Sequence, residues 1–318
     1  MNVDLLAIVG PTAVGKSKIS IDMAQRLNAE IISCDSMLVY RRCDIGTAKP
    51  QRKERAMVKH HLIDLVEPDE LYNVSRYVND SRQAIEDIQS RGKLPLLVGG
   101  TGLYLSALLE NYNFPIAEPN PSFRQRLQKQ ARLDGTSTLH KQLKNIDPAS
   151  AKLIHPNDLL RIVRALEIYE QTNQPASHHQ KIDEGKTHCY NACVVGLLLE
   201  KHLLHRRIEE RIKHMTDEGL IKEVEQLLKL FPPNVKPLQA IGYREFVPVV
   251  EGRKTVKEAI SACCQNTKRL SKRQLTWFKN KSYITWLDVG CMSINDVATQ
   301  IQSLWMEFKF APSSPKGN

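Results

Sequence analysis

The sequence lacks long apolar runs. A membrane-spanning helix needs about 20 consecutive apolar residues, whereas the longest runs here cover only residues 5–9, 94–98 and 194–199. The N-terminus also lacks the basic segment, apolar stretch and small-residue cleavage site of a signal peptide, and Asp4 interrupts its first apolar residues. We therefore expect a cytoplasmic protein with no membrane partner.

The sequence also has few cysteines, and they form no disulfide pattern. The seven cysteines are odd in number and scattered, and Cys263 and Cys264 are adjacent, which is typical of thiols in a reducing compartment. Cys189 and Cys193 are the only other close pair, and no His lies at zinc-finger spacing. Buried thiols are therefore favoured over a zinc site.

No residue type dominates the composition. Apolar residues make up 42% of the 318 residues and charged residues 25%, with 15 Gly and 16 Pro. These values exclude collagen, a coiled coil and a wholly disordered chain. A chain of this length can bury a core without disulfide or metal cross-links.

Positive charge is concentrated in one part of the chain. Lys and Arg number 14 against 14 Asp and Glu in residues 1–111, 11 against 9 in 112–200, 18 against 9 in 201–281, and 2 against 3 beyond. A basic part beside a neutral part suggests that one binds a polyanion and the other a small ligand. Charge alone allows a merely basic surface about equally well.

Short apolar runs alternate with helical patterns over the first hundred residues. This alternation predicts an α/β fold in which a parallel sheet is flanked by helices and binds ligands at the carboxyl ends of its strands. The expected strands are 5–9, 31–33 and 94–98, and the expected helices are 16–27, 74–90 and 101–109.

The pattern becomes purely helical after Tyr112 and returns to the mixed type near residue 190. We expect a catalytic core of residues 1–111 and 190–311, a helical insertion domain of residues 112–189, and a flexible tail of residues 312–318. The expected helices of the insertion are 122–132, 138–143 and 159–171. The returning core has expected strands at 193–199 and 283–287, two helices within 201–230, and helices at 256–280 and 294–308.

A phosphate-binding motif follows the first expected strand directly. It matches G-x-x-x-x-G-K-[ST], in which backbone amides surround an anion, the lysine adds positive charge and the hydroxyl can hold Mg²⁺. A chance Gly-rich turn is the alternative, but the strand before the motif and the helix after it argue against one. The motif consists of Gly10, Pro11, Thr12, Ala13, Val14, Gly15, Lys16 and Ser17.

The neighbouring strand does not supply the second acid of a phosphoryl-transfer enzyme. It ends in Gly99-Gly100-Thr101-Gly102 rather than in the usual metal-binding Asp, which argues against a kinase or ATPase. The glycines and Thr101 either bind phosphate or only start the next helix, with Thr101 as its cap.

Asp35 follows the second expected strand and should lie at the same edge of the sheet. A carboxylate there can accept a proton from an incoming nucleophile. Taken alone, Asp35 or Ser36 more commonly caps a turn.

Residues 267–279 form a basic helical segment with five cations, and no acid occurs from residue 259 to 287. A stripe of this kind suits a nucleic-acid backbone, with Gln274 and Trp277 available to a base. A solvated basic face is the alternative.

Three further arginines, Arg206, Arg207 and Arg211, face either solvent or the phosphate site, and pairing with Glu209 and Glu210 on the surface is the simpler interpretation. The histidine pairs at 60–61 and 178–179 are interpreted as structural or surface residues.

These motifs, in this order and spacing, resemble those of the tRNA dimethylallyltransferases over nearly the whole chain. They are GPTAVGKS (10–17), DS (35–36) with Tyr40, DIGTAKP (44–50), HHLID (60–64), LVGGTGLY (97–104), HPND (155–158), RALE (164–167), QAIGYRE (239–245) and KRQLTW (272–277). Eukaryotic relatives often add a zinc finger that is not seen before Asn318, so the chain resembles the bacterial type.

The resemblance implies a P-loop NTPase-like fold that binds dimethylallyl diphosphate in place of ATP. Asp35 would take a proton from the exocyclic amine of the tRNA adenosine at position 37, which is flipped out of the anticodon loop, while that amine displaces diphosphate. Thr101, Arg211 and the P-loop, with Mg²⁺ on Ser17, would stabilise the leaving diphosphate. We also expect a monomer bound to tRNA.

The resemblance also implies a set of tRNA contacts. Leu38 and Leu160 stand where the family more often has polar or basic residues. The implied contacts are Asp35, Ser36, Met37, Leu38, Thr101, Phe123, Leu160, Arg161, Ile162, Val163, Arg164, Gln239, Ala240, Ile241, Gly242, Tyr243, Arg244, Lys272, Arg273, Gln274, Leu275, Thr276, Trp277, Phe278 and Lys279.

Three alternatives compete with this interpretation. A P-loop kinase of a small metabolite would leave the missing second acid and the basic part unexplained. A prenyltransferase acting on free adenine nucleotide would need no basic surface. A non-catalytic RNA-binding protein would leave the P-loop beside Asp35 without a use.

Overall fold

The computed structural model describes residues 3–110, 112, 117–179 and 190–310. The chain divides into two compact units, one formed by Met1–Leu109 with Cys189–Asn318 and the other by Glu110–His188. Cys189 and the predicted tail at 312–318 lie outside the described residues. None of the helices that the structure describes is long and apolar enough to cross a membrane.

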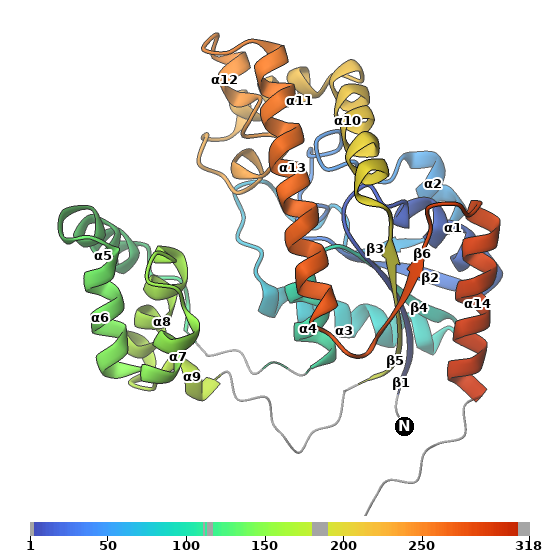
Figure 1. Ribbon diagram of the computed structural model, residues 1–318, viewed down its shortest axis with the longest axis horizontal. Helices are drawn as coiled ribbons and strands as arrows, with labels where there is room; N and C mark the ends of the chain where they lie inside the picture. The colour runs from blue at the N-terminus through green and yellow to red at the C-terminus, as the bar shows by residue number, and fades with distance from the viewer. Residues whose placement is uncertain (1–2, 111, 113–116, 180–189, 311–318) are drawn as a thin grey trace, which may run out of the picture. The chain divides into compact units, whose positions relative to one another are not determined.

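The first unit is built on a six-stranded sheet in the order β3-β2-β4-β1-β5-β6 (Figure 1). Every neighbouring pair is parallel, so the predicted parallel α/β sheet is confirmed. Its strands are β1 (Val3–Val9), β2 (Ala29–Cys34), β3 (His60–His61), β4 (Leu94–Gly99), β5 (Tyr190–Leu198) and β6 (Ile284–Asp288).

The inner strands are apolar because helices cover the sheet. Leu5 to Val9 of β1 are completely buried, which is typical of parallel strands covered on both faces.

The helices α10 and α13 run side by side and pack together (Figure 1). The helices of this unit are α1 (Lys16–Arg26), α2 (Arg52–Met57), α3 (Val74–Ser90), α4 (Gly102–Leu109), α10 (Lys201–Asp217), α11 (Leu220–Leu230), α12 (Val247–Val250), α13 (Val256–Lys279) and α14 (Ile294–Phe310), with a 3-10 turn η1 (Pro237–Gln239).

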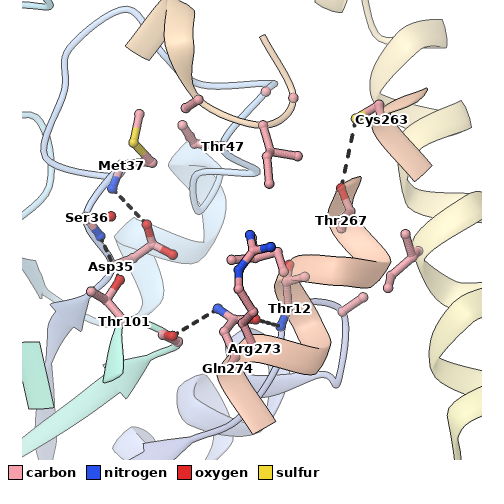
Figure 2. Close-up of a pocket in the computed structure, with 18 of the residues that line it drawn as sticks. Thr12, Asp35, Ser36, Met37, Thr47, Thr101, Cys263, Thr267, Arg273 and Gln274 are labelled. Carbon is pink, nitrogen blue, oxygen red and sulfur yellow. Dashed lines mark hydrogen bonds between the residues drawn. The ribbon is translucent and has the colours of Figure 1, made fainter. Parts of the chain in front are cut away.

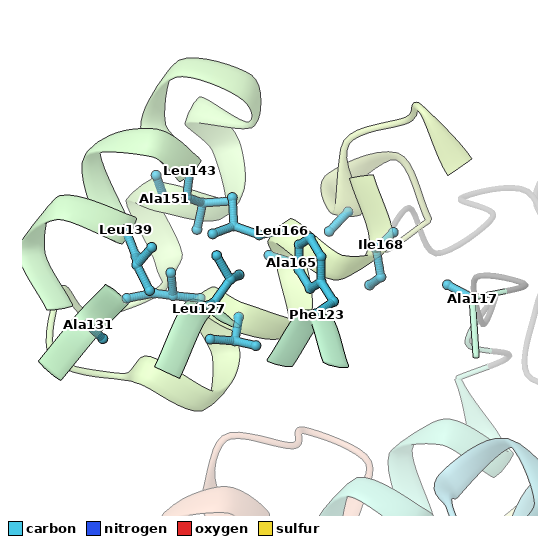
Figure 3. Packing of buried hydrophobic residues seen from close by; sticks show 13 residues of the cluster. Ala117, Phe123, Leu127, Ala131, Leu139, Leu143, Ala151, Ala165, Leu166 and Ile168 are labelled. Atoms are coloured by element: carbon cyan, nitrogen blue, oxygen red, sulfur yellow. The ribbon is translucent and has the colours of Figure 1, made fainter. Parts of the chain in front are cut away.

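Helices are the only regular secondary structure among the described residues of the second unit, which has its own apolar core (Figure 3). Leu139, Leu143 and Ile162 are completely buried there. Asn120 and Asp158 cap two of its helices, because their side chains accept backbone N–H groups of the first turn. Its helices are α5 (Pro121–Asp134), α6 (Thr136–Ile146), α7 (Pro148–Leu153), α8 (Leu159–Thr172) and α9 (Ala176–His179).

The short elements are those that the sequence did not predict. Strand β3 has two residues, too few to show a period, and α2 buries none of its side chains. A hydrophobic pattern cannot reveal a helix without an apolar face.

A buried carboxylate, Glu167 on α8, joins three parts of the helical unit. It accepts the Asn120 N–H at 2.7 Å, Nε and Nη2 of Arg124 at 2.8 and 2.7 Å, and Nη1 of Arg164 at 2.6 Å. Burial acts to raise the pKa of Glu167, but these hydrogen bonds outweigh it and lower the pKa from 4.5 to about 2. The ionised form of Glu167 therefore stabilises the unit.

We expect this stabilisation to depend on pH. A lowered pKa gives stability that is complete above the unfolded pKa of 4.5 and is lost as pH falls towards about 2. Glu167→Gln should therefore destabilise the helical unit by roughly 3 kcal/mol at pH 6 and by less than half of that at pH 3. Urea unfolding followed by circular dichroism measures both values. Glu170→Gln, on the exposed face of the same helix, is the control, and an equal effect of Glu167→Gln at both pH values would contradict the assignment.

Candidate functional site

The P-loop connects β1 to α1 at the carboxyl edge of the sheet. Gly10 and Gly15 have φ angles of 147° and 111°, and Ala13 is left-handed at 66°. A Cβ on Gly10 would lie 2.8 Å from the carbonyl oxygen of Leu197, so only glycine fits. The helix α1 begins at Lys16, and its N-terminal amides are suited to an anion.

Lys16 is held inside this loop. Its Nζ donates to the carbonyl oxygens of Gly10 at 2.9 Å and Pro11 at 2.8 Å. Burial lowers the pKa of Lys16 to about 8, although the nearby Asp35 carboxylate opposes the shift. An anion in the loop would raise the pKa of Lys16 and so favour its charged form, which in turn binds the anion more tightly.

The simpler interpretation, in which the arginines of α10 pair with acids on the surface, holds for only one of the three. Arg206 pairs with Glu210 on the exposed face, whereas Nη1 of Arg207 donates to the Val14 carbonyl at 3.1 Å. Arg211 points inward, where Nη1 donates to Oγ1 of Thr12 at 3.4 Å and Nη2 to the Thr47 carbonyl at 3.5 Å. Arg211 therefore adds a second cation beside the P-loop.

Asp35 lies directly after β2 and is half-buried. Its Oδ1 accepts the Met37 N–H at 2.8 Å, and Oγ1 of Thr101 accepts the Ser36 N–H at 3.1 Å (Figure 2). The capping interpretation and the catalytic one are thus compatible, since the turn that Asp35 closes also fixes its carboxylate.

Two adjoining cavities meet at Asp35. The P-loop cavity, of about 220 Å³, is lined by Lys16, Ser17 and Ser33. The helix cavity, of about 420 Å³, extends between α10 and α13. The helix cavity is lined by the apolar side chains of Ile208, Ile212, Met215 and Leu270. Both cavities share Thr12, Ala13, Asp35, Thr47, Gly100, Arg211 and Gln274.

The glycine turn, Gly99-Gly100-Thr101-Gly102, follows β4 and packs against side chains of α13. A Cβ on Gly100 would lie 2.5 Å from Nε2 of Gln274, and one on Gly102 would overlap the indole of Trp277. Gln274 bonds to the backbone of Thr12 and Gly100, contrary to the expectation that its amide is available to a base. The glycines of this turn therefore allow α13 to pack closely against it. The two interpretations from the sequence, phosphate binding and the start of a helix, did not include this role.

Sequence reasoning missed Glu223 on α11. Its carboxylate accepts the backbone N–H groups of Asp44, Ile45 and Gly46 at 2.9–3.1 Å and the hydroxyl of Tyr243 at 2.7 Å. These contacts fix two walls of the helix cavity. The available signal was an acid on the apolar face of an amphipathic helix, since Leu220, Val224 and Leu227 are also buried.

Some of the residues expected to contact tRNA are buried in the structure, and others are exposed or half-buried. Ile162, Val163, Tyr243 and Phe278 are buried, so the expectation of a side-chain contact with RNA is corrected at these four positions, where the side chains pack. Gly242 is buried as well and has no side chain to offer. Phe123 is also in the core of the helical unit. Exposed or half-buried positions are Ser36, Met37, Leu38, Thr101, Leu160, Arg161, Arg164, Gln239, Ala240, Ile241, Arg244, Lys272, Arg273, Leu275, Thr276, Trp277 and Lys279.

Some of these exposed cations already have partners. Arg164 bonds to Glu167 and to the Ala117 carbonyl, and Arg244 pairs with Glu245. Arg273 lines the helix cavity, which places a cation where a phosphate or a base could enter.

Five of the six described cysteines are packed thiols, and the sixth, Cys291, is exposed. Cys34, Cys43, Cys193, Cys263 and Cys264 are buried and free. No group of three or more His, Cys, Asp or Glu that could hold a metal occurs among the described residues. The close pair of cysteines is untested because Cys189 lies outside them.

Comparison with known proteins gives consistent matches. A family model described as IPP transferase matches residues 38–281, and one described as isopentenyl transferase matches residues 3–65. The tRNA dimethylallyltransferase of Carboxydothermus hydrogenoformans is 44% identical over 301 residues, covering 95% of this chain and 97% of the relative. That of Symbiobacterium thermophilum is 45% identical over 300 residues, or 94% of each.

Solved structures agree with this result. The tRNA isopentenylpyrophosphate transferase of Bacillus halodurans has a TM-score of 0.71 and 40% identity, over 96% of this chain and 98% of that one. A eukaryotic dimethylallyltransferase solved acting on tRNA has a TM-score of 0.82 and 28% identity, over 98% of this chain and 81% of that one.

The lowered pKa of Lys16 predicts that anion binding depends on pH. Protonated Lys16 attracts inorganic diphosphate, so the affinity should fall by about tenfold between pH 7 and pH 9, as pH passes the pKa of about 8. Isothermal titration calorimetry at several pH values measures this. Lys16→Arg stays charged throughout the range and controls for titration of diphosphate itself, so the same pH dependence in both proteins would rule Lys16 out.

Proposed function

Because this chain belongs to the IPP transferase family, we propose that it transfers a dimethylallyl group from dimethylallyl diphosphate to tRNA. The acceptor is the exocyclic amine of the adenosine at position 37, beside the anticodon, and diphosphate is released. The observation that carries the proposal is the meeting of a cationic P-loop cavity and a partly apolar helix cavity at Asp35.

The P-loop end stabilises the leaving group. As the allylic carbon–oxygen bond breaks, negative charge grows on the diphosphate. The side chains of Lys16 and Arg211 are already held beside that position, so little reorganisation of these two cations is needed during the reaction.

Asp35 acts as the general base toward the acceptor amine. The exocyclic amine attacks the allylic carbon, and Asp35 takes the proton that the amine loses as the new carbon–nitrogen bond forms. The Met37 amide holds one carboxylate oxygen, which fixes the direction in which the carboxylate faces.

The P-loop cavity also fits a magnesium ion. The hydroxyl of Ser17 lines it, and the buried Oγ of Ser33, which also lines it, has no hydrogen-bond partner in the structure. Mg²⁺ prefers such oxygen ligands together with phosphate oxygens and water. When bound, the ion would neutralise charge on the diphosphate.

tRNA reaches the site through the helix cavity and the basic face of α13, and the helical unit contributes further contacts to tRNA. Arg273 and Trp277 line this cavity, which supports entry of a flipped base there. The cytoplasmic location and the monomeric state remain predictions from the sequence.

The P-loop kinase alternative is less well supported. Asp35 is the one acid among the described residues that line the P-loop cavity, whereas a kinase needs separate acids for its metal and its nucleophile.

Mass spectrometry of an unmodified tRNA transcript tests the proposed function. After incubation with the protein, Mg²⁺ and dimethylallyl diphosphate, we expect one added prenyl unit on the adenosine at position 37. A parallel reaction with ATP is the control. Transfer of label from ATP, with no prenylation, would favour the kinase instead.

Asp35→Asn is expected to lower turnover by roughly 10²- to 10⁴-fold, the usual contribution of a general base. The amide oxygen can still accept the Met37 N–H, so the turn and the affinity for tRNA should be kept. Single-turnover prenylation and filter binding measure the two effects. Asp69→Asn, at an exposed position away from both cavities, is the matched control, and unchanged turnover in Asp35→Asn would exclude Asp35 as the base.

A further inference from the structure

Gln274 joins three segments that are far apart in the chain. Its Oε1 accepts the backbone N–H of Thr12 at 2.9 Å, and its Nε2 donates to the carbonyl oxygen of Gly100 at 2.9 Å. Figure 2 shows both bonds. Because one partner is a donor and the other an acceptor, the orientation of the amide is determined by its surroundings.

One side of this amide packs closely against the glycine turn. A Cβ on Gly100 would lie 2.5 Å from Nε2 of Gln274 and 3.2 Å from the carbonyl oxygen of Gly10. One helical turn further along α13, Trp277 covers Gly102, and its indole Nε1 donates to Oγ of Ser106 at 3.4 Å. The helix is thus held against the glycine turn on both sides of Thr101.

Within the P-loop, the hydrogen bond to Gln274 fixes the backbone of Thr12. Gln274 holds its backbone N–H, and Arg211 donates to its hydroxyl. The two residues before it, Gly10 and Pro11, have their carbonyl groups held by Lys16. Without Gln274, the Thr12 backbone would lose its anchor to α13 while the rest of the loop kept its own contacts.

We propose that Gln274 is a positioning residue for the diphosphate, which it serves by holding the P-loop in its binding conformation, and that its amide, already bonded to Thr12 and Gly100, does not bind a base of the tRNA. The proposal rests on the proposed function, because the diphosphate is the part of the substrate that the P-loop receives. A donor set that is fixed before the reaction stabilises charge better than one that must be ordered first.

Gln274→Met tests this proposal, because methionine keeps the volume and removes both hydrogen bonds. We expect the Kd for inorganic diphosphate with Mg²⁺ and the KM for dimethylallyl diphosphate to rise by about tenfold, which corresponds to a P-loop that occupies its binding conformation about a tenth of the time. The Kd for tRNA should stay at its wild-type value, and the thermal unfolding midpoint should fall by only a few degrees, because two backbone groups lose their partner while the packing of α13 is kept. Gln265→Met, on the exposed face of the same helix, is the control.

A second variant separates the two bonds. Gln274→Glu can still accept the Thr12 N–H but places a carboxylate against the Gly100 carbonyl and beside the anion site. It should therefore weaken diphosphate binding more than Gln274→Met does.

Three results would overturn the proposal. Weaker tRNA binding with unchanged diphosphate binding would make Gln274 a tRNA contact, and equal losses of diphosphate and tRNA binding would make it a structural residue. Unchanged values throughout would leave its hydrogen bonds without a role. Binding of inorganic diphosphate needs no prenyl transfer, so this test stands even where the proposed function fails.

Discussion

The parallel pairing of β1, β4 and β2 ends three neighbouring strands at one edge of the sheet. Val9 pairs with Gly99, and Cys34 pairs with Gly99 from the other side. The P-loop, the glycine turn and Asp35 are the next residues of these strands, so the backbone hydrogen bonds of the sheet bring them together. The helices α10 and α13 then contact this edge through Arg211 and Gln274.

The sequence predicted the parts of the site that depend on local pattern. The P-loop is contiguous, and Asp35 follows an apolar strand, so both could be placed at the sheet edge without knowing any distant contact. The longer strands and helices were predicted for the same reason, because each shows a hydrophobic period over many residues.

The parts that could not be predicted depend on contacts between distant residues. Gln274 and its partner Thr12 are 262 residues apart, and Glu223 and Asp44 are 179 apart. A sequence motif also does not say which of its residues face outward: Lys272 is exposed, whereas Phe278 of the same helix is completely buried. Burial of this kind is decided by tertiary packing rather than by the local pattern.

The chain order of the sheet has a consequence for protein synthesis. Strand β1 pairs with β4 and β5, but the whole helical unit lies between β4 and β5 in the sequence, and Gln274 comes later still. On the ribosome, the helical unit can fold as soon as it emerges, because its core is made of its own residues. The P-loop gains its last support only after Gln274, 262 residues further along the chain than Thr12, has been made.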